Sequence, residues 1–125
     1  MKLVRRDNYL FPNQARNIGW REVQTKYTVF IDNDVIVTPG WLESLVRCAE
    51  ETGAGIVGPL TCQKEPLHTE IHCAGGESGI RIEAQDGLET RHFVERIYDQ
   101  GKQVADKLPG YRRVKTGLAE FHCVL

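Results

Sequence analysis

The sequence predicts an α/β fold with a mixed, mainly parallel sheet, and three neighbouring patterns carry this prediction. Residues 27–31 form an apolar run typical of a buried strand, residues 39–52 have the spacing of an amphipathic helix, and residues 56–57 form a second short apolar run between glycines. Strand, helix and strand in close succession favour a right-handed crossover between parallel strands. A chain of 125 residues has room for one domain and one core.

The composition favours neither nucleic acid nor a membrane as a partner. Sixteen basic and 17 acidic residues give a net charge of −1, with no long run of either sign. The apolar runs, of about five residues, are far shorter than the roughly 20 that span a bilayer. We therefore expect no nucleic-acid partner, no transmembrane segment in this chain and a cytoplasmic location, with membrane association through a larger parent protein left open. The four cysteines are scattered, as in a reduced protein.

Two helices are expected in the first half of the chain. Residues 12–24 carry apolar or small side chains at helical spacing. In the second helix, Thr38 is the expected N-cap and Pro39 suits the first turn, because its missing N–H would be unpaired there. Gly53 follows the last helical residue and suits a helix end. An apolar stripe on this second helix predicts the face that packs on the sheet.

The second half of the chain is expected to be mostly extended. Residues 71–76 suggest a strand that ends in a glycine turn, and residues 80–84 alternate apolar and polar side chains like a half-buried antiparallel strand. Residues 95–107 have helical spacing, although residues 92–97 alone also fit a strand. The last stretch, residues 117–125, is expected to be a strand.

Asp32 and Asp34 directly follow the apolar run of residues 27–31. Carboxylates at the carboxyl end of a buried strand lie where α/β sheets bind their ligands. Two acids so close together repel one another unless a cation or a shared proton intervenes. The residues alone therefore predict a divalent metal site in this acidic loop.

Other chemistries also begin with two aspartates at this spacing. A calcium loop of the helix–loop–helix type is excluded, because Ile36 and Val37 stand where that loop needs an oxygen ligand and a glycine. A haloacid-dehalogenase-like phosphatase would use Asp32 as the nucleophile and Asp34 as the general acid. In a non-catalytic module the two acids would only cap a strand and solvate a loop. The last two alternatives stay open at this point.

Four segments together narrow the choice, and they resemble the family 2 glycosyltransferases of the GT-A fold. The segments are ARNIG at 15–19, YTVFIDNDVIVTPGWLESL at 27–45, GIVGP at 55–59 and IHCAGG at 71–76. The resemblance is most specific between about residues 13 and 60. It implies a nucleotide-diphospho-sugar transferase domain with a Rossmann-like sheet. It also implies transfer of a sugar from a nucleotide-diphospho-sugar donor to a glycan, lipid or protein acceptor.

The resemblance also implies roles for individual residues. Asp34 would ligate Mn²⁺ or Mg²⁺ bridging the diphosphate, and Asp32 would contact the ribose or the donor sugar, directly or through the water of the metal. Hard cations are often held in this way, by one or two carboxylates together with substrate phosphates. Asn33 would keep the loop polar beside the donor. Arg16 and Asn17 resemble positions near the donor, and an ordinary place on a helix surface is the alternative.

Compared with the family pattern, residues 1–125 are expected to be a single incomplete GT-A domain. The nucleotide-binding strands would precede the helix at residues 12–24, and the region of the catalytic base would follow the final strand. No catalytic residue is therefore assigned within the chain, and the isolated chain is expected to be inactive. Glu120 is the nearest acid, a rim carboxylate that alternation places on one face with His122.

The strand at residues 27–31 would lack a neighbour on one side in such an incomplete sheet. An open strand edge presents unpaired N–H and C=O groups, which tend to recruit another chain. We therefore expect a homodimer through this exposed sheet edge.

Overall fold

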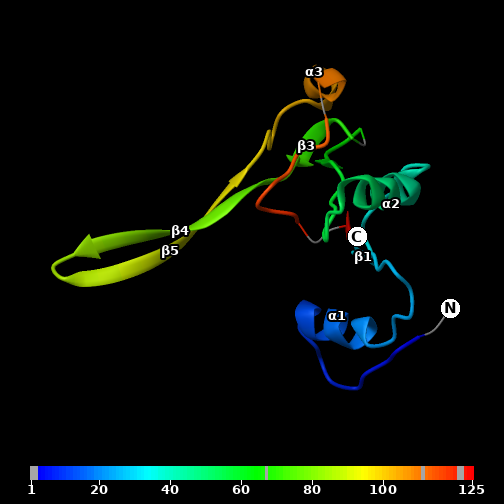
Figure 1. Ribbon diagram of the computed structural model, residues 1–125, viewed down its shortest axis with the longest axis horizontal. Helices are drawn as coiled ribbons and strands as arrows, with labels where there is room; N and C mark the ends of the chain where they lie inside the picture. The colour runs from blue at the N-terminus through cyan, green and yellow to red at the C-terminus, as the bar shows by residue number, and fades with distance from the viewer. Residues whose placement is uncertain (1–2, 67, 111, 121–122) are drawn as a thin grey trace.

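The computed structural model describes residues 3–66, 68–110, 112–120 and 123–125. Figure 1 shows a packed body and a long two-stranded ribbon that extends away from it. The elements in chain order are α1 (Pro12–Trp20), β1 (Phe30–Ile31), α2 (Trp41–Thr52), β2 (Thr61–Gln63), β3 (Glu70–Cys73), β4 (Gly76–Gln85), β5 (Leu88–Ile97), α3 (Val104–Lys107), the 3₁₀ helix η1 (Leu108–Gly110) and β6 (Cys123–Val124).

The described strands form three antiparallel pairs, β1 with β6, β2 with β3 and β4 with β5, so the prediction of a mainly parallel sheet is wrong. Phe30 lies opposite Val124 in β6. The next residue, Leu125, exchanges two backbone hydrogen bonds of 2.9 and 3.0 Å with Val57. Neighbouring residues of a strand direct their backbone groups to opposite edges. The last residues of the chain therefore lie between β1 and the Val57 segment, the two strands that the expected crossover connects.

Helix α2 covers this small sheet and supplies much of the core. Leu45 and Ala49 are one turn apart on the helix and are buried together with Val57 and Cys123. The predicted end of this helix before Gly53 is confirmed, since Gly53 is the C-cap with φ of 67°. The predicted start is wrong: the N-cap is Gly40, with φ of 74°, and the N–H of Trp41 reaches back to the carbonyl of Thr38 at 3.3 Å. Glycine accepts this left-handed conformation at little cost.

Helix α1 begins at Pro12 as expected but ends at Trp20, before the expected limit of residue 24. Arg21 is its C-cap, and the chain then forms hydrogen-bonded turns from Gly19 to Glu22 and from Trp20 to Val23. The helix has no buried residue. Because helix stability comes mainly from packing of an apolar face, a helix without that support ends early.

Strand β3 is held by backbone hydrogen bonds to the residues that follow β5. Ile71 is fully buried, and its backbone exchanges hydrogen bonds of 2.9 Å with Gly101 and Lys102. The N–H of Val104 binds the carbonyl of Thr69 at 3.0 Å. This tether places α3 beside β3, as Figure 1 shows.

The prediction of a helix at residues 95–107 is wrong for its first part, because residues 95–97 belong to β5, which pairs with β4. Gly76 pairs with Ile97 and Gln85 pairs with Leu88, so the two strands stay in register over their whole length. The alternative interpretation of residues 92–97 as a strand is confirmed, and only Val104–Lys107 is helical. Val94 and Ile97, two of the apolar residues at helical spacing, lie in β5 opposite Gly79 and Gly76, and this cross-strand pairing decides between helix and strand. In the described ranges, no helix is both long and apolar enough to cross a membrane.

Candidate functional site

The acidic loop leaves the end of β1 in a tight turn. The N–H of Val35 donates to the carbonyl of Asp32 at 3.3 Å, which places Asn33 and Asp34 at the turn itself. Asn33 and Asp34 are exposed, whereas Asp32 is half-buried. The two carboxylates therefore have different surroundings although only one residue separates them.

Arg16 on α1 meets Asp32 across the space between the helix and the loop. The guanidinium Nη2 lies 3.1 Å from Oδ1 of Asp32, and its Nη1 lies 3.2 Å from Oδ1 of Asn13. The side chains of Arg16 and Asp32 are 25% and 36% exposed, so the pair is partly withdrawn from water. Arg16 is thus held toward the loop.

This ion pair changes the electrostatics expected for the loop. The positive charge of Arg16 offsets the repulsion between Asp32 and Asp34. Among the described residues, no hydrogen bond or ion pair holds the side chains of Asn17, Asn33 or Asp34, and all three are exposed. The structure therefore joins Arg16 with Asp32 and does not join Asn17, Asn33 and Asp34 to them.

The donor set at the loop fits a hard cation in part. Over the described ranges, no group of three or more His, Cys, Asp and Glu side chains is arranged to hold a metal ion. An exposed carboxylate such as Asp34, next to one that an arginine already binds, matches sites in which substrate phosphates complete the ligand set. The residues present thus fit a cation that arrives together with a diphosphate.

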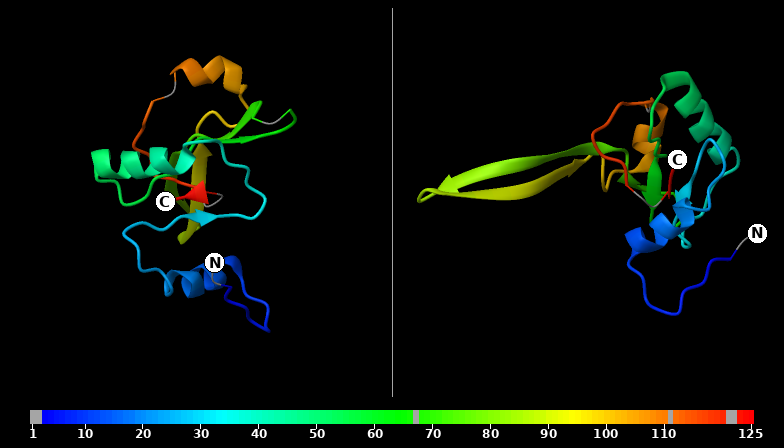
Figure 2. Two further views of the ribbon diagram at one scale, coloured as in Figure 1. Left: turned by 90° about the vertical axis from the view of Figure 1, so that its right-hand side faces the viewer. Right: turned by 60° about the horizontal axis from the view of Figure 1, so that its bottom comes forward.

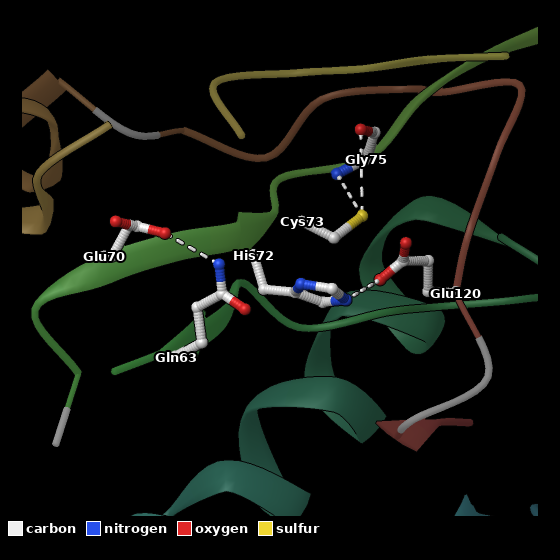
Figure 3. A network of polar contacts seen from close by, with 6 residues as sticks. All are labelled: Gln63, Glu70, His72, Cys73, Gly75 and Glu120. Atoms are coloured by element: carbon white, nitrogen blue, oxygen red, sulfur yellow. Dashed lines mark hydrogen bonds and ion pairs between the residues drawn. The ribbon is translucent and has the colours of Figure 1, made fainter. Parts of the chain in front are cut away.

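A second polar cluster lies between β3 and the segment that leads into β6 (Figure 3). His72 Nε2 lies 3.1 Å from Oε2 of Glu120, and the two side chains are 28% and 21% exposed. Glu120 was expected to be a rim carboxylate, and the structure instead withdraws it from water beside an imidazole. Its expected neighbour on the same face, His122, lies outside the described residues.

His72 and Cys73 are neighbours in β3, and their side chains lie on opposite faces of the strand. Cys73 is buried, and its Sγ accepts a hydrogen bond of 3.3 Å from the N–H of Gly75 (Figure 3). Burial raises the pKa of the Cys73 thiol, and the nearby Glu120 carboxylate raises it further, so this thiol stays protonated near neutral pH. Sequence reasoning missed His72 as the partner of Glu120. The alternation of polar and apolar residues at 70–73 was the signal, since it places His72 on the face of the strand away from Ile71 and Cys73.

Both clusters flank the same end of the β1 and β6 pair. Ile31 lies opposite Cys123, Asp32 follows Ile31 directly, and Glu120 precedes Cys123 in the chain. Because the two strands are antiparallel, the chain leaves β1 where it enters β6. The acidic loop and the pair of His72 and Glu120 are therefore anchored to one end of this ladder.

Comparison with known families identifies the chain. The model of glycosyl transferase family 2 matches residues 1–66, which is more than half of the sequence. The chain belongs to glycosyl transferase family 2. The match contains α1, β1, the acidic loop and α2, so the ion pair of Arg16 and Asp32 lies inside the part that defines this glycosyltransferase. We found no match among curated proteins or among solved structures.

Family membership confirms the resemblance noted in the sequence and implies a GT-A-like fold for the matched part. The elements observed are helices and small antiparallel sheets. A glycosyltransferase acts on a nucleotide-sugar donor and an acceptor, and this much follows from the family. The phosphatase alternative, with Asp32 as the nucleophile, receives no support from the match.

Proposed function

We propose that this glycosyltransferase transfers a sugar from a nucleotide-diphospho-sugar to a glycan, lipid or protein acceptor, in a reaction that depends on Mn²⁺ or Mg²⁺. The acidic loop of Asp32, Asn33 and Asp34 is the proposed donor site. The observation that supports it best is the 3.1 Å ion pair between Arg16 and Asp32. It brings two separate segments of the family match to one place and orients a carboxylate there.

Asp34 is the proposed metal ligand, because its carboxylate is exposed and lies at the turn. A bound divalent ion would supply Lewis-acid stabilisation of the negative charge on the departing nucleoside diphosphate. Asp32 contacts the ribose or the donor sugar, or the metal through water. The contact with Arg16 limits the orientations open to the Asp32 side chain, which lowers the entropy lost on binding the donor.

Arg16 has a second role in this proposal, since an arginine is always charged and binds phosphate oxygens as well as carboxylates. Its position at the loop puts a positive charge close to the diphosphate. Asn17 and Asn33, which are both exposed, provide polar groups at the edge of the donor site. Arg16 and Asp32 are thus fixed by their ion pair, whereas the neutral side chains of Asn17 and Asn33 adapt to the donor.

The remaining parts of the proposal concern what surrounds the donor site. The base that deprotonates the acceptor is not assigned to any residue of this chain, and the chain by itself is expected to be inactive in transfer. The proposed location is the cytoplasm, with membrane association through a larger parent protein left open. Self-association is also part of the proposal, and the outer edge of β1 is the surface that the sequence suggests for it.

Titration of Mn²⁺ with inorganic pyrophosphate tests the donor site without requiring a pocket for the nucleotide base. We expect wild-type chain to bind the metal–pyrophosphate complex, and Asp34→Asn to weaken this binding tenfold or more, because a ligand charge is lost. Arg16→Met should weaken it less, since it removes a phosphate-binding charge while Asp34 stays. Glu43→Gln, an exposed acid on α2, is the matched control and should change nothing.

Electron paramagnetic resonance of Mn²⁺ provides the readout, as the change in signal relative to Mn²⁺ and pyrophosphate without protein, because pyrophosphate alone also broadens the signal of the free ion. Equal binding by Asp34→Asn and wild-type chain would exclude Asp34 as the ligand. The same titration with UDP and GDP on the full-length gene product then tests donor recognition. Absence of metal-dependent nucleotide binding there would leave only a non-catalytic module.

A further inference from the structure

The ribbon of β4, the turn at residues 86–87 and β5 is called the arm below. Figure 1 and the right-hand view of Figure 2 show it extending from the body, with only its base near other elements. Every residue from Ile80 to Arg91 is exposed. The base is fixed, because Gly76 pairs with Leu118 and the hydroxyl of Ser78 donates to the carbonyl of Gly117 at 3.2 Å.

The two faces of the arm differ in character. Side chains directly opposite each other in an antiparallel pair lie on the same face. The rows Ser78–Glu95, Ile80–Phe93, Ile82–Arg91 and Ala84–Glu89 form what is called here the apolar face. On this face Ile80, Ile82 and Phe93 are 66%, 55% and 68% exposed. The other face carries mainly charged and polar residues, such as Arg81 with His92 and Glu83 with Thr90.

The two faces also differ in whether their charged side chains have partners within the arm. On the polar face, Glu83 lies 3.1 Å from Arg81 and 3.4 Å from His92, so these charges are satisfied within the arm. On the apolar face, no ion pair or hydrogen bond engages the side chains of Arg91 and Glu95 in the part of the chain that the structure describes. The apolar face thus combines uncovered hydrophobic side chains with charges that lack a partner.

A two-stranded ribbon of this kind needs a further layer. Isolated hairpins are marginally stable in water, and they become stable when a hydrophobic face packs against something else. Contiguous exposed apolar side chains mark such a contact surface. The question is which partner fits a face whose central row is apolar and whose neighbouring rows carry Arg91 and Glu95.

We propose that the partner is a second copy of this chain, whose arm packs face to face on the first. The two-fold axis runs across the strands through the row of Ile80 and Phe93. It stacks Phe93 on Phe93 and Ile80 on Ile80. It also places Arg91 over Glu95 of the second copy, and Glu95 over Arg91 of the second copy, so both unsatisfied charges gain a partner.

Charge selects this register over its neighbours. Moving the two-fold axis one row toward the tip places Arg91 on Arg91, and moving it one row toward the base places Glu95 on Glu95. Like charges directly opposite one another are destabilising. The strong twist of two-stranded ribbons confines the contact to the few central rows, and these rows hold the complementary pair.

The charge of the arm disfavours an anionic lipid surface as the partner. Residues 76–97 carry five acidic residues against three arginines, which gives a net charge of −2. Attachment to anionic membranes relies on clusters of basic residues. The face is self-complementary, which is the property that an isologous dimer requires.

A charge-exchange series measured by sedimentation equilibrium tests the proposal on the whole chain. Wild-type chain should dimerise. Arg91→Glu and Glu95→Arg should each weaken association tenfold or more, because each opposes like charges, and the double variant should return to within threefold of wild type. Phe93→Ser should abolish the dimer. Thr90→Lys adds a charge to the polar face of the same strand, opposite Glu83, and should leave association unchanged.

Circular dichroism of each variant separates lost association from lost folding, and recovery in the double variant excludes a folding defect in the two single ones. A chain that remains monomeric at several hundred micromolar would overturn the proposal. So would a dimer that persists in Phe93→Ser and in both single charge variants, because association would then lie elsewhere, as at the edge of β1. Binding of the wild-type monomer to anionic vesicles would assign the face to lipid instead.

Discussion

The strands of the body and the strands of the arm are stabilised by different interactions. In the body, β1 and β6 are only two residues long each, yet Cys123 and Val124 are almost fully buried, and Cys123 packs in one cluster with Leu45 and Ala49 of α2. In the arm, two ten-residue strands pair along their whole length while only Gly76, at the base, is buried. The body is therefore held by burial between segments far apart in the sequence, and the arm by a local hairpin ladder. Long strands do not by themselves indicate where the stability of a protein lies.

Truncation of the core should produce the largest effect and should affect the body alone. Leu45→Ala removes a side chain that is 5% exposed, and it should lower the free energy of unfolding by about 3 kcal/mol through lost burial and a cavity. Leu42→Ala, on the same helix but 39% exposed, is the matched control and should cost about 1 kcal/mol or less. Urea unfolding monitored by circular dichroism measures both. Equal losses would mean that α2 does not pack as described.

The junction of the arm and the body should be the next most sensitive point. A Cβ added at Gly76 would lie 2.5 Å from the backbone oxygen of Arg96, which cannot move without breaking the register of the arm. Gly76→Ala should therefore cost about 1–3 kcal/mol, in the range of overpacked sites. Gly79→Ala is the control, because its Cβ would meet only Val94, at 4.0 Å. It should be neutral or slightly stabilising in urea unfolding, since alanine has less backbone entropy to lose.

The sequence predicted the parts of this fold that local chemistry decides. The end of α2 at Gly53 follows from a capping preference and the start of α1 at Pro12 from helical spacing, and both predictions are confirmed. The pairing of β1 with β6 joins residues more than ninety positions apart, and no local pattern contains that information. The same limit explains why a mainly parallel sheet was expected. A strand from the end of the chain lies between β1 and the Val57 segment, and local patterns do not contain that contact.

The candidate site also has one part that was predictable from a single stretch of sequence and one part that was not. The acidic loop and its family were accessible from residues 15–59, since spacing within one stretch carries them. The contact of Arg16 with Asp32 and that of His72 with Glu120 depend on side chains meeting across different elements. Helical spacing in residues 94–104 misled the prediction for the arm, because pairing of Val94 and Ile97 with Gly79 and Gly76 on β4 decides their structure.

Thiol reactivity should distinguish closed from open states of the body. Cys73 and Cys123 are 3% and 4% exposed, and burial raises the pKa of both thiols. A raised pKa leaves less thiolate at a given pH, so alkylation by iodoacetamide at pH 8 should be at least tenfold slower than in urea. The rate should then rise with pH toward the thiol pKa. Peptide mass spectrometry assigns the modified cysteines, and rapid labelling of both in native protein would contradict the described core.

Removal of the arm should have the smallest effect on the body, and this experiment tests the comparison most directly. Replacing residues 80–93 with Asn-Gly connects Gly79 to Val94, which are already opposite each other, through the turn that two-residue hairpins prefer. The base keeps the pairing of Gly76 with Leu118 and the 2.7 Å hydrogen bond from the Tyr98 hydroxyl to Glu77.

Because no apolar residue of the removed segment is buried, we expect the free energy of unfolding to change by less than about 1 kcal/mol. Urea unfolding at low protein concentration measures the body without a contribution from self-association. The shortened chain should also keep the slow alkylation of Cys73 and Cys123. A loss as large as that of Leu45→Ala would show that the arm takes part in folding of the body, and its apolar face would then have a role within the chain itself.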